Sequence, residues 1–152
     1  MEHIAKISAN DLKGHNSFVL RNCVVGTIDL IGVFDLEVHL TIENCVVDNL
    51  LIHSCWFSKG CTIKNSVIVS YVDYQMGGHN LRPIVLEGNV FNEFFNFFDC
   101  QFNDAIEVRS NIFLKGTNLL GNKGEGFENT FAHGCIVEGN IGSMDVDGEG
   151  YD

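Results

Sequence analysis

The chain reads Ile42-Glu43-Asn44-Cys45-Val46-Val47, and five other stretches repeat the same order of residue types. That order is an aliphatic residue, a charged residue, two small or polar residues, Val or Ile, and usually another apolar residue. The other copies begin at Leu20, Ile63, Leu86, Val108 and Val137, so the residue numbers of successive starts differ by 22, 21, 23, 22 and 29. A period of roughly 22 residues predicts a solenoid in which each repeat forms one coil.

Each copy follows a short run in which apolar and polar residues alternate, as in Leu40-Thr41-Ile42-Glu43. Alternation of this kind predicts a β-strand with one face in the core. The small polar pair predicts a bend, because Asn and Gly tolerate left-handed backbone conformations. A related pattern recurs half a coil later in Ile52-His53-Ser54-Cys55-Trp56-Phe57 and Phe97-Phe98-Asp99-Cys100-Gln101-Phe102. We therefore expect at least two strand–bend–strand corners in each coil.

The charged position of the repeat alternates in sign along the chain. It holds Arg21, Glu43, Lys64, Glu87, Arg109 and Glu138. Coils stacked in sequential order and in register would place opposite charges side by side, which favours that register over a slipped one. The alternation therefore predicts parallel stacking of consecutive coils.

These features resemble right-handed parallel β-helices of the pectate-lyase-like type, which carry an asparagine ladder at a bend. The resemblance covers roughly residues 18–142. It implies an all-β, single-domain, right-handed parallel β-helix of about six coils, with a repeat of roughly 22 residues per coil. The stretch Phe97–Ala105 also has a weak local similarity to pentapeptide-repeat proteins, although the five-residue step is not kept along the chain.

The segments outside the repeat have separate expected roles. Residues 1–17 lack the pattern and should form an N-terminal cap over the open end of the solenoid. Residues 75–83 should form a loop, and residues 116–134 an insertion, on the surface of the β-helix repeats at 18–142. Residues 143–152 are acidic and rich in Gly, which is typical of a flexible tail.

Composition narrows the classes of function. The formal net charge of −11 argues against binding to nucleic acid and to anionic membrane surfaces. No apolar stretch is long enough to span a membrane and no secretory signal is visible, so we expect a cytoplasmic protein. The six cysteines match no zinc-binding spacing. They should be buried free thiols, and we expect no metal and no cofactor.

The fifth position of the repeat is the first candidate binding surface. It holds Val24, Val46, Val67, Val90 and Ile112, followed by Ile141 in the last copy. These side chains either fill the core or form an apolar stripe along the outside. An outward stripe would predict a non-catalytic scaffold that binds a protein partner or forms a homo-oligomer.

A small carbohydrate-binding or carbohydrate-cleaving β-helix is the alternative. It requires Trp56, His79, Asp99 and Asp104 to converge in one groove, with His79 as the best acid–base or contact residue. No nucleophile or phosphate-binding motif supports an enzyme, and we assign no catalytic residue. A third possibility, an acidic mimic of DNA, is disfavoured by the alternating signs of the charged column.

Overall fold

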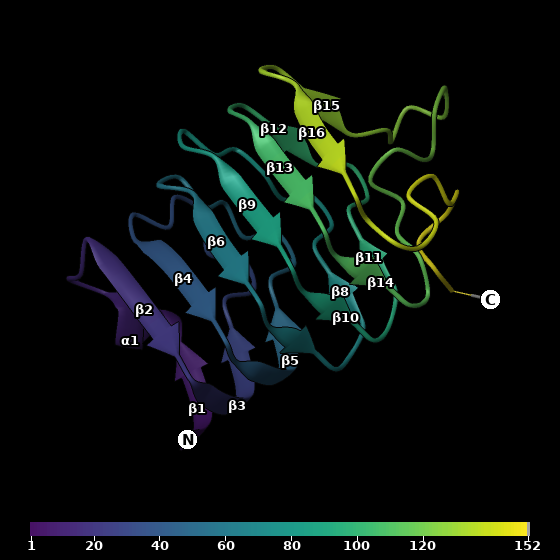
Figure 1. Cartoon of the computed structure of the whole chain (residues 1–152). Coiled ribbons are helices and arrows are strands. Elements are labelled where there is room, and N and C mark those ends of the chain that lie inside the picture. Colours follow the sequence, from purple (N-terminus) through teal and green to yellow (C-terminus); the bar gives the residue numbers. More distant parts are fainter. Residues whose placement is uncertain (152) are drawn as a thin grey trace.

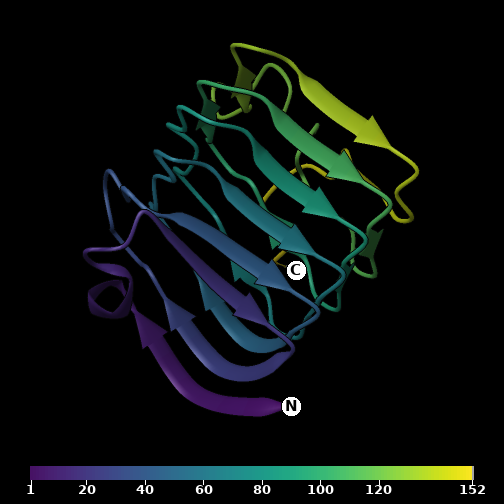
Figure 2. The ribbon, with the colours of Figure 1, turned by 60° about the vertical axis from the view of Figure 1, so that its left-hand side comes forward.

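The computed structural model describes residues 1–151 and shows a parallel β-solenoid of about five turns (Figures 1 and 2). One six-stranded sheet, which we call sheet A, has the order β1-β3-β5-β7-β10-β14. Its strands are β1 (Glu2–Ser8), β3 (Cys23–Asp29), β5 (Val46–Leu51), β7 (Val67–Ile68), β10 (Val90–Phe91) and β14 (Ile112–Phe113).

The second six-stranded sheet, sheet B, has the order β16-β13-β9-β6-β4-β2. Its strands are β2 (Ser17–Arg21), β4 (His39–Glu43), β6 (Cys61–Lys64), β9 (Ile84–Glu87), β13 (Ile106–Arg109) and β16 (Cys135–Glu138). The third side carries the short pair β12 (Gln101–Phe102) with β15 (Thr130–Phe131), and another short pair, β8 (Val72–Asp73) with β11 (Phe95–Asn96), lies between sheet A and the half-coil bend. The only helix among the described residues is α1 (Ala9–Leu12).

The stacking register confirms the alternating charged column. Along sheet B, Glu43 pairs with both Arg21 and Lys64, and Glu87 pairs with Lys64 and Arg109. Three contacts close into ion pairs, at 3.1 Å for Arg21–Glu43, 3.4 Å for Lys64–Glu87 and 3.6 Å for Arg109–Glu138. Because all of these side chains are substantially exposed, their main effect is on register rather than on stability.

The bend between the two sheets has the predicted left-handed backbone. Asn22, Asn44 and Asn65 have φ angles of 56°, 52° and 49°, and Gly88, Ser110 and Gly139 follow at 71°, 56° and 66°. The residue after each of these points inward. In the later coils it is an asparagine, and Asn89 Nδ2, Asn111 Nδ2 and Asn140 Nδ2 each donate to a carbonyl of the preceding coil at 2.8–2.9 Å.

Aliphatic and aromatic side chains from all three sides fill the interior. The phenylalanine-rich stretch supplies much of the core of the later coils, where Phe91 stacks on Phe113 and Phe95 on Phe97 at ring distances of 4.9 and 4.1 Å. Phe98 is half-buried and stacks on Phe127 at 5.1 Å. The insertion that carries Phe127 therefore covers Phe98, which lies outside the core.

The two ends of the solenoid differ in how their core residues are covered. At the start, β1 adds a strand to sheet A, and α1 follows with Leu12 fully buried. At the far end, Phe131, Cys135 and Val137 of the last coil are only half-buried. Residues 143–151 do not leave the molecule as a separate tail. Their backbone continues the ladder through bonds such as Thr117 N to Ser143 O at 2.8 Å, and Asp152 lies outside the described residues.

In both the predicted loop at 75–83 and the predicted insertion at 116–134, only part of the range protrudes from the coils. Gly78 bridges to Trp56 on one side and to Gln101 on the other, so most of 75–83 stays within the coil, and Leu81 and Arg82 are exposed. Within 116–134, Thr117 bridges to Phe95 and β15 pairs with β12. The longest exposed stretch of the insertion is 123–128, and Thr130 and residues 132–134 are exposed as well.

All six cysteines are free within residues 1–151, and five of them are buried. Desolvation raises the pKa of Cys61 to about 12 and that of the half-buried Cys135 to about 11. These thiols are therefore protonated at neutral pH and act as small core side chains. No helix in the described chain has the length and apolar character needed to cross a membrane.

Candidate binding surfaces

The fifth position of the repeat forms an outward column on sheet A. Val46 pairs with Val24 and Val67, and Val90 pairs with Val67 and Ile112, so the residues lie on consecutive strands. Ile141 continues the column through a bridge to Ile112. Each Val is half-exposed, whereas the residue after it is buried. Of the two orientations that the sequence leaves open, the structure shows the outward one, and we call Val24, Val46, Val67, Val90, Ile112 and Ile141 the aliphatic column.

The aliphatic column broadens toward the C-terminal end of the solenoid. Ile141 is 64% exposed, and Leu114, two residues beyond Ile112, is 60% exposed. Nearer the N-terminal end, the position two residues beyond the column is occupied by Gly26 and Asp48. The same position holds Val69, Asn92 and Ser143 on the other rungs, so the exposed apolar surface is largest where Leu114 and Ile141 lie.

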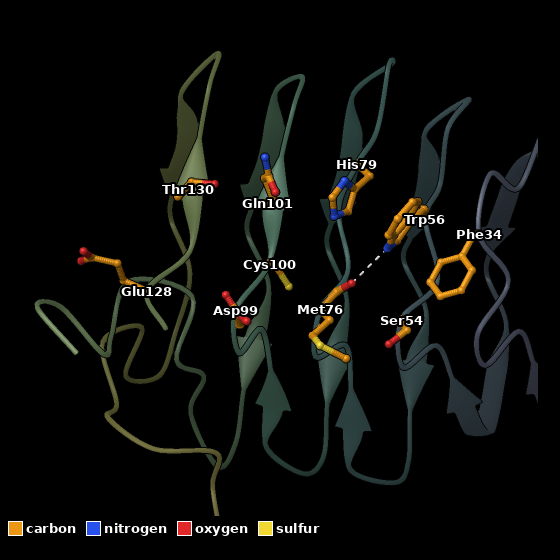
Figure 3. A pocket seen from close by; sticks show the side chains of 10 residues that line it. All are labelled: Phe34, Ser54, Trp56, Met76, His79, Asp99, Cys100, Gln101, Glu128 and Thr130. Atoms are coloured by element: carbon orange, nitrogen blue, oxygen red, sulfur yellow. Dashed lines mark hydrogen bonds between the residues drawn. The ribbon is translucent and has the colours of Figure 1, made fainter. Parts of the chain in front are cut away.

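A groove of about 580 Å³ runs along the third side of the solenoid. Figure 3 shows that its lining residues come from neighbouring coils and that their side chains follow the solenoid axis. They form two rows. Phe34, Trp56, His79, Gln101 and Thr130 make the first row, and Ser54, Met76, Asp99 and Glu128 make the second, with Cys100 between them.

The two rows arise from the half-coil corner. Ser54, Met76 and Asp99 occupy equivalent positions with left-handed φ angles of 55°, 55° and 56°. Their backbone N–H groups donate to the next coil, as in Ser54 N to Gln75 O and Met76 N to Phe98 O, both at 2.9 Å. This bend turns the chain sharply, so the residues on either side of it face the same concave surface.

Three rings stack at one end of the groove. Trp56 lies between Phe34 and His79, with ring-centroid distances of 4.5 and 4.0 Å. The indole N–H donates to the backbone carbonyl of Met76 at 3.1 Å, which fixes the ring (Figure 3). His79 stacks on the indole with 29° between the ring planes, whereas the ring of Phe34 is tilted by 58°, so other rings contact Trp56 on two sides.

The opposite end of the groove is acidic, because Asp99 and Glu128 are exposed there. Nearer the aromatic end, desolvation lowers the pKa of His79, while the carboxylate of Asp35 opposes that shift. The imidazole is therefore neutral at neutral pH. In the described chain, the residues that line the groove include no Lys or Arg.

The structure brings together three of the four residues that the carbohydrate alternative requires. Trp56, His79 and Asp99 line the groove, whereas Asp104 does not and instead accepts a hydrogen bond from the backbone of Ala105 at 2.7 Å. Sequence analysis missed Phe34, Met76 and Glu128. The half-coil pattern aligns Trp56 with Gln101 and Ser54 with Asp99, so the alignment of its copies already indicated that these residues lie in shared rows.

Neither surface has the donor set of a metal site. Within residues 1–151, no group of three or more His, Cys, Asp or Glu side chains is arranged to hold a metal ion. Cys100 in the groove is buried, and desolvation raises its pKa well above the usual range, so it is not a thiolate nucleophile at neutral pH. Comparisons with protein families, with curated proteins and with solved structures find no match to this chain.

Proposed function

We propose that the protein is a non-catalytic β-helix scaffold that binds another protein through sheet A, and that a second copy of the chain is its first partner. The aliphatic column carries this proposal. One aliphatic residue on each of six consecutive rungs of sheet A gives an apolar stripe roughly 24 Å long at about 4.8 Å per rung. A continuous stripe of this kind is typical of a contact surface.

Two copies facing each other across sheet A would form a symmetric pair. A two-fold axis places the same patch on both subunits, so the stripe needs only to complement itself. Leu114 and Ile141 supply the most exposed apolar side chains on this face. Polar residues such as Asp48 and Asn92 flank the column, as expected for the rim of an interface.

The solution mass tests this proposal. Size exclusion with light scattering should give a dimer, and the variant V67K/V90K should give a monomer because two adjacent strands then carry charges in the contact. T41K/V85K is the matched control, since it adds the same charge on outward positions of sheet B. It should remain dimeric, with circular dichroism confirming that both variants fold. A wild-type monomer, or a dimer that survives V67K/V90K, contradicts the proposal.

We also propose that the solenoid is right-handed and of the pectate-lyase-like type. Parallel crossovers are overwhelmingly right-handed, and the ladder of Asn89, Asn111 and Asn140 supports the same type of bend. Carbohydrate binding is less well supported, because Asp104 lies outside the groove and the only tryptophan of the chain is already packed against other rings. The indole of Trp56 is packed between Phe34 and His79.

A further inference from the structure

The groove beside Trp56 is a second contact surface, separate from the aliphatic column. The two surfaces share no residue. The first row of the groove takes one residue from each of five successive coils, Phe34 to Thr130. At about 4.8 Å per coil its length is roughly 19 Å. A ligand that fills it must therefore be elongated along the solenoid axis.

One end of the groove is apolar and adaptable. Phe34 is 58% exposed and Met76 is 45% exposed, although both are large apolar side chains. The flexible thioether of Met76 can adjust to different apolar partners. These two side chains would lose exposed apolar surface if an aliphatic or aromatic residue packed against them, and that loss favours binding.

The other end selects for positive charge. Asp99 and Glu128 are exposed there, and Glu128 accepts one hydrogen bond, from the backbone N–H of Gly124 at 3.3 Å. The net charge of −11 adds a long-range attraction for cations. Because His79 is neutral, no cationic side chain among the lining residues balances the two carboxylates.

We propose that this groove binds an extended segment of a partner protein that carries apolar residues at one end and Lys or Arg at the other. The apolar residues pack on Phe34 and Met76, and the basic residues pair with Asp99 and Glu128. A strand advances about 3.3 Å per residue, so a groove of roughly 19 Å holds about six residues. Arginine suits the acidic end best, because its guanidinium can pair with a carboxylate through two parallel hydrogen bonds.

The single tryptophan makes the proposal directly measurable. Trp56 is the only tryptophan of the chain and lies in the groove, so its fluorescence reports on occupancy. The probes are capped hexapeptides with two leucines, two serines and two arginines, made in both directions. We expect one direction to change the emission saturably, and to bind about fivefold more weakly when the salt is raised from about 50 to about 500 mM.

Charge-neutral variants test the role of the carboxylates. D99N/E128Q should weaken peptide binding by about fivefold, because each exposed ion pair contributes modestly. E37Q/E93Q is the matched control, since it removes the same charge from exposed positions outside the groove. It should bind the peptide as the wild type does.

Three outcomes overturn the proposal. The first is equal binding of a peptide in which glutamate replaces arginine. The second is binding of neutral cellohexaose without binding of either basic peptide, which would assign the groove to a glycan. The third is an unchanged Trp56 emission together with no heat of binding in calorimetry for either peptide.

Discussion

The same bend is built with thiols in the first coils and with amides in the later ones. Cys45 Sγ donates to the carbonyl of Leu20 at 3.4 Å, and Asn111 Nδ2 donates to the equivalent carbonyl of Leu86 at 2.9 Å. Only the amide also accepts strongly, since Asn111 Oδ1 receives the backbone N–H of Asn89 at 3.0 Å. Amides at this position therefore satisfy both backbone groups of the bend, whereas thiols are weak donors and weak acceptors.

The same bend geometry is therefore stabilised by two different kinds of side chain. In the later coils, Asn89, Asn111 and Asn140 link consecutive coils through side-chain bonds at 3.0 Å. In the first coils, Cys23 and Cys45 fill the corner as small apolar groups, and the long pairing of β1, β3 and β5 supplies more backbone bonds. The later coils should consequently depend on single polar side chains more than the first coils do.

Removal of the central amide should have the largest effect. N111A leaves the N–H of Asn89 and the carbonyl of Leu86 without their buried partner, and should lower the free energy of unfolding by about 3 kcal/mol. Urea denaturation followed by circular dichroism measures the change. N92A is the control and should shift stability by about 0.5 kcal/mol or less, because Asn92 lies at a half-exposed position of the neighbouring coil. Similar losses in both variants would remove the proposed role of the ladder.

Buried thiols should make stability depend on alkaline pH. The unfolded thiol has an ordinary pKa of 9.0, and burial raises the pKa of Cys61 to about 12. The folded chain keeps this proton while the unfolded chain releases it, so the contribution is complete below pH 9 and declines as the pH rises toward about 12. Between pH 8 and 10, wild type should lose about 1 kcal/mol more than C61V. Parallel pH profiles would contradict this assignment.

The thiol corner should tolerate substitution better than the amide corner. C45S should change the free energy of unfolding by about 0.5 kcal/mol or less, because Ser66 occupies the equivalent position and donates to the Lys64 carbonyl at 2.8 Å, as Cys45 Sγ donates to the Glu43 carbonyl at 3.2 Å. C45A should cost about 1 kcal/mol through lost packing. If C45A were as destabilising as N111A, the two kinds of corner would be equivalent after all.

The charged column should have the smallest effect. E43K places three positive charges on neighbouring strands, beside Arg21 and Lys64, and should destabilise by about 0.5 kcal/mol at low salt. E43Q serves as the neutral control. High salt should remove most of the difference between the two variants in thermal or urea unfolding. A difference that persists at about 1 M salt would point to packing rather than charge.

The length of the repeat, about 22 residues per turn, and its register were readable from the sequence because both rest on local patterns. Alternating apolar residues, Asn or Gly at the bend and alternating charges all require only one coil and its neighbours. The path of residues 143–151 was not readable in this way. Their ordering comes from contacts distant in sequence, such as Asn118 Nδ2 to Gly148 O and Tyr71 Oη to Glu149 O.

The candidate site was only partly predictable for a similar reason. Trp56 and Asp99 belong to the half-coil pattern, so sequence analysis could single them out. Phe34 ends the stretch Leu30-Ile31-Gly32-Val33-Phe34, which keeps the half-coil pattern only in part. Glu128 comes from an insertion whose position depends on the pairing of β15 with β12. The orientation of the aliphatic column stayed ambiguous because the bend could turn Val67 either way until its strand partners were known.

The extra strand β1 has a consequence for assembly. Counting the bridge at Ile141, sheet A has seven rungs and sheet B has six, because β1 extends sheet A alone. A second molecule placed on the C-terminal end could continue sheet A only by leaving a one-strand gap in sheet B. The two ends of the solenoid therefore cannot continue both sheets at the same time. This mismatch opposes head-to-tail growth into fibres, a known hazard of exposed strand edges, and leaves sideways pairing unobstructed.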